Sequence, residues 1–275
     1  MLKTRLWVGS TLIALTIGVL WVDGWFAPWY PIFGLVLLAV GLAGTWELVD
    51  LLGEPRPARW VSLTAVGTLL GVNWVPHLVG GSEPLAWLAG ALAGVLMLLF
   101  ANEARLFQEP GTATRRLAAS FFVVGYLGFL PCFLTQLRWR SDGALALAAA
   151  IFITKSCDIG AYFTGRLLGR HRMSPILSPK KTWEGAAGGL ILATLTGVGF
   201  LAWTYPWWAA ALLGLTLGLA GMIGDLMESL LKRDSGQKDA STLVPGFGGV
   251  LDVIDALLFA GPVAYFGFLC LDSWR

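Results

Sequence analysis

The stretch GWFAPWYPIFGLVLLAVGLAGTW, residues 24–46, contains no charged side chain. A helix needs roughly 20 apolar residues to cross the hydrocarbon core of a bilayer, and a run of this length meets that need. Similar runs recur along the whole chain, separated by short segments that carry the charges. They are too long and too numerous to form the core of a soluble domain. The pattern therefore predicts a polytopic integral membrane protein.

The composition indicates the same class. Of the 275 residues, 56% are hydrophobic and 13% are charged, and the mean hydropathy is +0.71. Soluble domains carry about 25% charged residues. The formal net charge of +2 offers no basic surface for nucleic acid. Cys132, Cys157 and Cys270 are far apart in the sequence, so we expect neither a disulfide framework nor a zinc site.

We predict an all-α fold with about nine transmembrane helices, each close to the length that a bilayer requires. The expected spans are residues 6–22, 27–52, 60–80, 85–101, 117–137, 144–166, 186–204, 207–231 and 249–271.

Lysine and arginine in the connecting segments predict the orientation, because they accumulate in short cytoplasmic loops. With the N-terminus inside and the C-terminus outside, most basic residues lie on the cytoplasmic side. Arg138 and Arg140 contradict this trend, since they would lie in an exterior loop. We expect a multi-pass protein of a bacterial inner membrane, because the chain is compact and shows no targeting sequence, with its active site at the cytoplasmic face.

The two halves of the chain differ in character. Residues 1–140 form an N-terminal set of plain transmembrane helices, and residues 141–275 form a C-terminal catalytic region with cytoplasmic loops. Lys155 and Asp158 lie inside an apolar span of this region, three residues apart and so on one helical face. A charge near the bilayer centre costs about 2.5 to 3.5 kcal/mol, so the pair faces a polar cavity or neutralises itself while holding helices together.

Basic and hydroxyl side chains are frequent in GRLLGRHRMSPILSPKKTWEG, residues 165–185. Lysine and arginine bind phosphate oxygens through charge-assisted hydrogen bonds, and the free N–H groups at a helix start favour anions. The positive-inside rule explains the charge alone. It does not explain two Ser-Pro steps followed by Lys180, Lys181 and Thr182 before a helix, so we predict phosphate binding here.

Carboxylates recur on two predicted helices near the end of the chain. Asp225 and Glu228 share one helical face, and Asp252 and Asp255 stand one turn apart at the start of the last span. A helix dipole stabilises acids near an N-terminus, which explains Asp252 and in part Asp255. It does not explain the other two. Carboxylates facing one another from two helices are the ligands that Mg²⁺ prefers, so we predict a metal site.

These residues fall in a pattern that resembles a known signature. The pattern is Ser229-x-x-Lys232-Arg233, then Lys238-Asp239, then PGFGGVLDVID at residues 245–255. It closely resembles the signature of the phosphatidate cytidylyltransferase (CDP-diacylglycerol synthase) family. The segments around Asp158, at 165–166, at 178–185 and at 224–229 also look like that family, so the resemblance covers roughly residues 150 to 265.

The resemblance implies the reaction of CTP with phosphatidate, a membrane lipid, to give CDP-diacylglycerol and pyrophosphate, with Mg²⁺ as cofactor. It also suggests a homodimer. Together with the residue pattern, it predicts the catalytic residues Asp225, Asp252, Lys232, Lys238 and Asp239. The predicted metal ligands are Asp225, Asp252, Asp255 and Glu228. The predicted substrate-binding residues are Lys155, Asp158, Arg166, Ser178, Lys180, Lys181, Thr182, Glu184, Ser229, Arg233, Gly248 and Gly249.

Two positions depart from the signature. Phe247 stands where the family usually has histidine, and Val253 where it usually has arginine. Both remove a polar group near the expected phosphates, which leaves room for an altered substrate or an inactive relative. The alternatives are another CTP-dependent lipid kinase or transferase, a membrane transporter, which would also place charges at mid-membrane, and a non-catalytic scaffold.

Overall fold

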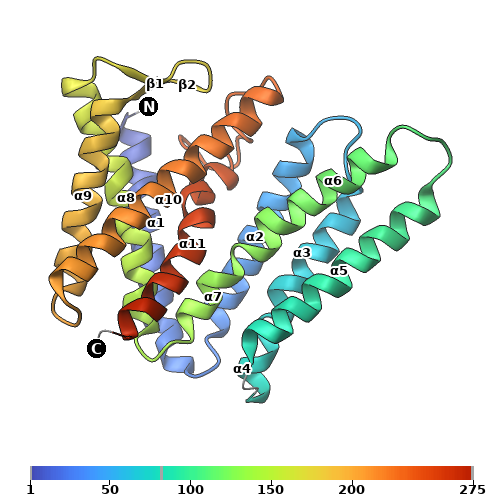
Figure 1. Cartoon of the computed structure of the whole chain (residues 1–275), viewed down its shortest axis with the longest axis horizontal. Helices are drawn as coiled ribbons and strands as arrows, with labels where there is room; N and C mark the ends of the chain where they lie inside the picture. The colour runs from blue at the N-terminus through green and yellow to red at the C-terminus, as the bar shows by residue number, and fades with distance from the viewer. Residues whose placement is uncertain (1, 81–82, 274–275) are drawn as a thin grey trace. The chain divides into compact units, whose positions relative to one another are not determined.

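The computed structural model describes residues 2–80 and 83–273 (Figure 1). Within these ranges, nine helical segments are long and apolar enough to cross a membrane. They correspond one to one to the predicted spans, so the predicted class is confirmed. The segments are Trp7–Phe26, Pro31–Leu51, Arg59–Val79, Pro84–Leu106, Ala113–Arg138, Gly143–Leu168, Trp183–Leu201, Trp207–Asp234 and Leu251–Asp272.

Most spans are single helices, but the first, third and fifth are each built from more than one element. The elements up to residue 138 are α1 (Leu2–Asp23), the 3₁₀ turn η1 (Gly24–Phe26), α2 (Pro31–Leu51), α3 (Arg59–Val72), α4 (Val75–Val79), α5 (Pro84–Leu106), α6 (Ala113–Val123), the π-helical turn η2 (Val124–Phe129) and α7 (Cys132–Arg138). Those that follow are α8 (Gly143–Leu168), β1 (Arg172–Ser174), β2 (Ser178–Thr182), α9 (Trp183–Leu201), α10 (Trp207–Asp234) and α11 (Leu251–Asp272).

A small sheet interrupts the helices. Strands β1 and β2 pair antiparallel, with Arg172 opposite Thr182 and Ser174 opposite Ser178. The sequence pattern predicted only a loop here. Strands of three and five mostly polar residues are too short to show the alternation of apolar and polar side chains by which a strand is predicted.

The chain divides into two compact units, which we describe separately. The first unit comprises the chain up to Trp139 together with Ser235–Val253, and the second comprises Arg140–Asp234 and the chain from Ile254 onward. The last boundary between the units, after Val253, falls inside α11. The first turn of this helix, with Asp252, therefore belongs to the first unit, while Asp255 belongs to the second.

In the first unit, α3 packs against α2, α5 and η2. Two glycines allow close approach to α3. A Cβ atom built on Gly41 of α2 would lie 2.6 Å from Leu70 Cδ1, and one built on Gly128 of η2 would lie 2.9 Å from Leu69 Cδ1. A side chain at either position would force the facing leucine side chain of α3 to move.

In the second unit, α9 packs against both α8 and α10, which also contact each other. Helices α8 and α9 lie side by side in Figure 1. A Cβ atom on Gly189 would lie 2.7 Å from the carbonyl oxygen of Cys157 in α8, and one on Gly197 would lie 2.8 Å from that of Ala210 in α10. Helices in a bilayer associate through close van der Waals packing, which small residues at the contact permit. The glycines of this unit therefore set how closely its helices approach.

The helices of the second unit end at two opposite sides of the unit. Helices α8 and α10 finish, and α9 starts, beside the β1–β2 hairpin; the Arg233 Nε at the end of α10 donates to the Leu177 carbonyl of the hairpin at 3.2 Å. We call this the hairpin end. At the opposite end, Asp272 of α11 lies beside Arg140, just before α8.

Candidate functional site

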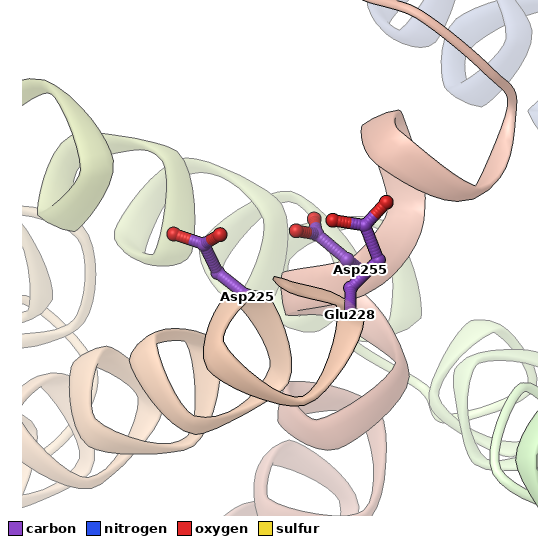
Figure 2. A group of neighbouring side chains, drawn as sticks. All are labelled: Asp225, Glu228 and Asp255. Carbon is purple, nitrogen blue, oxygen red and sulfur yellow. The ribbon is translucent and has the colours of Figure 1, made fainter. Parts of the chain in front are cut away.

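Three carboxylates from two helices converge in the second unit (Figure 2). Asp225 and Glu228 project from one face of α10, and Asp255 projects from α11. Each offers an oxygen, and these oxygens all lie within 4.8 Å of one another. Glu228 and Asp255 are buried, with 1% and 6% of their surfaces exposed, while Asp225 is partly exposed. We call these three residues the carboxylate cluster.

A glycine brings the two helices of the cluster together. Gly224 precedes Asp225 and is buried against α11: a Cβ atom built there would overlap the carbonyl oxygen of Asp255 and lie 3.1 Å from the Cα of Ala256. Glycine is thus the residue that lets the backbones of α10 and α11 touch at the level of the cluster.

Two lysines form ion pairs with the cluster. Lys181 Nζ, on β2, lies 2.6 Å from Asp225 Oδ2. Lys232 forms an ion pair with Glu228 one turn earlier on α10. These contacts bring the Lys-Lys-Thr segment and the Ser229–Arg233 segment, separate in the sequence, to one carboxylate cluster.

The mid-span pair of α8 also belongs to this site. Lys155 Nζ lies 3.3 Å from Asp158 Oδ2, and Lys155 interacts electrostatically with Asp225 and Asp255 as well. Counting Asp158 with the carboxylate cluster gives four carboxylates against three lysines, a formal net charge of −1.

The chemistry of this set suits a hard divalent cation together with phosphate groups. Carboxylate oxygens from two helices are the ligands of Mg²⁺, which usually takes few protein ligands and fills the rest of its octahedron with water and substrate phosphates. The lysines beside them are donors for phosphate oxygens. A site that holds both signs of charge can bind a polyphosphate and its counter-cation at once.

Two predicted substrate-binding residues of the hairpin end, Thr182 and Glu184, make structural contacts. Thr182 is buried and its Oγ1 accepts a hydrogen bond from the Gly185 N–H at 3.1 Å, which caps α9. Glu184 Oε2 accepts the backbone N–H groups of Arg170 and His171 at 3.1 and 3.2 Å, and its Oε1 lies 2.5 Å from His171 Nδ1. These contacts hold the hairpin to the start of α9.

The other basic residues of this end are open to solvent. Arg166 is exposed and its Nη1 donates to Tyr162 Oη at 2.8 Å, Lys180 is exposed on β2, and Arg233 is exposed at the end of α10. Ser178 at the start of β2 and Ser229 on α10 are partly buried. Binding of substrate by these residues stays a prediction.

The loop that carries the rest of the signature lies in the first unit. Asp252 Oδ2 accepts the N–H groups of Ala240 at 2.9 Å and of Gly249 at 2.7 Å. Lys238 and Asp239 are exposed in the same loop. Asp252 is not a member of the carboxylate cluster, so the predicted metal binding by Asp252 stays a prediction, as do the catalytic roles of Lys238 and Asp239.

Phe247, the first departure from the signature, packs against another helix of the first unit. The ring of Phe247 faces α1, where a Cβ atom built on Gly9 would lie 3.6 Å from Phe247 Cζ. The ring is partly buried, as is Val253. At Phe247, therefore, an apolar side chain packs beside an apolar helix.

One residue of the loop's surroundings was missed in the sequence. Glu47 of α2 is 3% exposed and contacts Ser241, Val250 and Leu251. An acid inside an apolar span is by default a candidate functional residue. The same rule that singled out Lys155 and Asp158 applies to Glu47. Glu47 was missed because the first half of the chain consists mostly of plain apolar spans, and the functional residues were expected in the second half.

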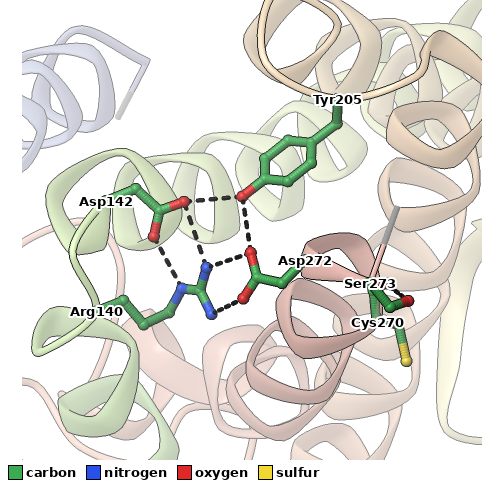
Figure 3. Close-up of polar contacts among 6 residues, drawn as sticks. All are labelled: Arg140, Asp142, Tyr205, Cys270, Asp272 and Ser273. Carbon is green, nitrogen blue, oxygen red and sulfur yellow. Dashed lines mark hydrogen bonds and ion pairs between the residues drawn. The ribbon is translucent and has the colours of Figure 1, made fainter. Parts of the chain in front are cut away.

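The two arginines that contradict the predicted orientation are both paired with acids. Arg138 Nε lies 3.3 Å from Asp23 Oδ2, and its guanidinium stacks 3.7 Å above the ring of Tyr30 in the first unit. Arg140, in the second unit, bridges Asp142 and Asp272, each at 2.9 Å (Figure 3). Their structural roles explain why they occur in a segment where basic residues are otherwise scarce.

The contacts around Arg140 form a closed network. Tyr205 Oη donates to Asp142 Oδ2 at 2.8 Å and lies 3.4 Å from Asp272 Oδ1 (Figure 3). Burial raises the pKa of Asp142, but the hydrogen bonds from Arg140 and Tyr205 outweigh it and leave this pKa below its ordinary value of 3.8. The network joins the starts of α8 and α10 to the end of α11.

We expect this network to make the protein sensitive to acid. A carboxyl group whose pKa is lowered by folding stabilises the protein above its unfolded pKa and loses that contribution as the pH falls through the folded value. Thermal unfolding in detergent should therefore show a larger drop in midpoint between about pH 5 and about pH 3 for the wild type than for Asp142→Asn. The exposed Glu54→Gln is the control, since exposed ion pairs contribute little. Equal acid sensitivity of wild type and Asp142→Asn would contradict the expectation.

The chain is similar to known proteins along nearly its whole length. The model of the cytidylyltransferase family matches residues 3–271. A phosphatidate cytidylyltransferase of Synechocystis sp. is 31% identical over 284 residues, covering 92% of each chain. One of Pseudomonas aeruginosa is 36% identical over 96% of this chain and 95% of its own, and one of Mycobacterium tuberculosis is 33% identical over 84% and 78%. The similarity confirms the resemblance of residues 150 to 265 and extends it to the first half.

Proposed function

Because the chain belongs to the cytidylyltransferase family, we propose that it converts CTP and phosphatidate into CDP-diacylglycerol and pyrophosphate within a membrane. The observation that supports this reaction is the carboxylate cluster with Lys155, Lys181 and Lys232 around it, set in spanning helices. A lipid phosphate and a nucleoside triphosphate both need cationic partners, and a membrane helix places these partners where the lipid resides.

The reaction needs no nucleophile from the protein. A phosphate oxygen of phosphatidate attacks the α-phosphorus of CTP, a new P–O bond forms, and the bond between the α-phosphorus and the bridging oxygen breaks to release pyrophosphate. Such transfers depend on positioning the phosphates and stabilising their charge. Lys181 and Lys232 are the groups that we assign to the phosphates, because each can exchange its carboxylate partner for a phosphate oxygen.

Mg²⁺ is the cofactor that we propose for this site. Asp225, Glu228 and Asp255 supply the carboxylate oxygens that this cation prefers, and the bound cation would neutralise charge on the phosphates. The three acids would also orient the neighbouring lysines when no cation is present. Asp252, three residues before Asp255 on α11, remains a predicted further ligand on the basis of the family signature.

We place the reaction at the cytoplasmic face of a bacterial inner membrane. Basic residues gather at the hairpin end of the second unit, namely Arg166, Arg170, Arg172, Lys180, Lys181, Lys232 and Arg233. At the opposite end, Arg140 is paired with two acids. This asymmetry is typical of a cytoplasmic hairpin end, where soluble CTP meets membrane-held lipid.

The test is incorporation of labelled CTP into lipid by the purified protein in detergent with phosphatidate. We expect CDP-lipid to form with Mg²⁺ and not when the divalent cation is chelated. Product with phosphatidate and none with diacylglycerol would separate a cytidylyltransferase from a CTP-dependent lipid kinase. A lack of CDP-lipid under every condition would contradict the proposal and would favour transport or binding.

A further inference from the structure

Glu47 is a buried carboxylate that contacts the signature loop, defined here as residues 240–251. Its Oε1 accepts the Ser241 Oγ–H at 2.6 Å and the Val250 N–H at 2.9 Å, and its Oε2 accepts the Leu251 N–H at 2.8 Å. All four residues belong to the first unit. None of the ion pairs among the described residues includes Glu47, so its charge is balanced by N–H and O–H donors.

The two backbone N–H groups that donate to Glu47 would otherwise lack a hydrogen-bond partner in the helix. Leu251 is the first residue of α11 and Val250 precedes it, and N–H groups at a helix start have no partner within the helix. The positive end of the helix dipole also lies here and favours a negative charge. Glu47 therefore fixes the start of α11 against α2.

The two glycines of the signature each make room for a carboxylate. A Cβ atom on Gly249 would lie 2.5 Å from Glu47 Oε2. A Cβ atom on Gly248 would lie 2.6 Å from Asp252 Oδ2, and Gly248 has a φ of +115°, which favours glycine. The glycine pair thus permits Glu47 and Asp252 to approach the same short stretch of backbone from two directions.

Asp252 and Glu47 accept hydrogen bonds from neighbouring N–H groups of the same backbone segment. The N–H of Gly249 donates to Asp252 Oδ2, and the next two N–H groups along the chain donate to Glu47. We propose that Glu47 is a positioning residue, which fixes the signature loop and so sets the orientation of the Asp252 carboxylate. This inference rests on the proposed function, in which Asp252 is a predicted ligand.

The test compares Glu47→Gln and Glu47→Ala with the wild type in two measurements. We expect kcat for CDP-lipid formation, per folded protein, to fall by about 10- to 100-fold, the size of effect seen when a partner that orients a functional carboxylate is removed. In hydrogen exchange, residues 240–252 should exchange faster while α9 is unchanged. Ser241→Ala removes one of three donors and should show a smaller effect in the same direction.

The matched control is Asp50→Asn, which removes a carboxylate from the same helix. Asp50 is exposed and pairs with Arg56 and Arg59, which lie outside the loop, so both readouts should stay at wild-type values. A Glu47→Gln protein with wild-type kcat and exchange would overturn the proposal. So would a uniform rise in exchange across all spans with normal kcat, which would mean a role in stability alone. If the wild type forms no CDP-lipid, the proposed function fails, and the exchange measurement still tests the hold of Glu47 on the loop.

Discussion

Replacement of Asp225 by asparagine should lower the rate of CDP-lipid formation by about 10³-fold, since the charge stabilisation by a bound metal ion is worth several kcal/mol and each ~1.4 kcal/mol is tenfold. Asp225 is the partly exposed member of the carboxylate cluster and the partner of Lys181. The substitution removes a negative charge from the site and leaves Lys181 without its carboxylate. The measurement is incorporation of labelled CTP into lipid over a range of Mg²⁺ concentrations.

Asp234→Asn is the control for this prediction. Asp234 is an exposed acid at the end of the same helix, α10, and lies outside the carboxylate cluster. Its replacement should leave the rate at the wild-type level. Thermal unfolding of both variants in detergent should match the wild type, because Asp225 is partly exposed. An Asp225→Asn protein that is folded and retains more than about a tenth of the wild-type rate, within ~1.4 kcal/mol of full activity, would refute the metal assignment.

Replacement of Gly224 by alanine should reduce activity by about 10²-fold, although it removes no functional group. The added Cβ would overlap the carbonyl oxygen of Asp255, which is backbone and cannot rotate away. Helices α10 and α11 must then separate, and Asp255 moves relative to Asp225 and Glu228. A misplacement of about 1 Å can cost about 10²-fold in rate. Overpacking of this kind also costs about 1 to 3 kcal/mol in stability.

Gly199→Ala distinguishes this local effect from a general effect of helix substitution. Gly199 lies in α9, and a Cβ built there has no atom within 4 Å. Alanine favours a helix over glycine, so this variant should be as stable as the wild type or slightly more so. The measurements are the rate and the unfolding midpoint of each variant. A Gly224→Ala protein with normal rate and midpoint would show that α10 and α11 do not need this contact.

The spans were predictable because a bilayer imposes a simple rule on length and polarity. Each predicted range agrees with a helical segment of the structure to within a few residues at its ends. The same rule singled out Lys155 and Asp158, because a charged residue inside an apolar span is costly and usually has a function. It did not predict the β1–β2 hairpin, because the paired strands are mostly polar and show no hydrophobic pattern.

The members of the site were largely predictable, but their partners were not. Asp225, Glu228, Asp252 and Asp255 were expected to hold a cation, and the structure groups all of them except Asp252 in the carboxylate cluster. The pairing of Lys181 with Asp225 joins residues 44 positions apart. No local spacing relates such distant residues. The contact depends on how the hairpin lies over α10, which only the packing of α8, α9 and α10 determines.

The sequence by itself determined the class of the protein, the number of its spans, its family and most of its candidate site, because these depend on local composition and on a contiguous signature. Only the tertiary structure shows which glycines bring helices into contact and which acids pair with Arg138 and Arg140. It also shows that Glu47 accepts hydrogen bonds from the signature loop. The physical reason is that a hydrogen bond or a close contact between distant segments depends on their separation in space, which leaves no periodic trace in the chain.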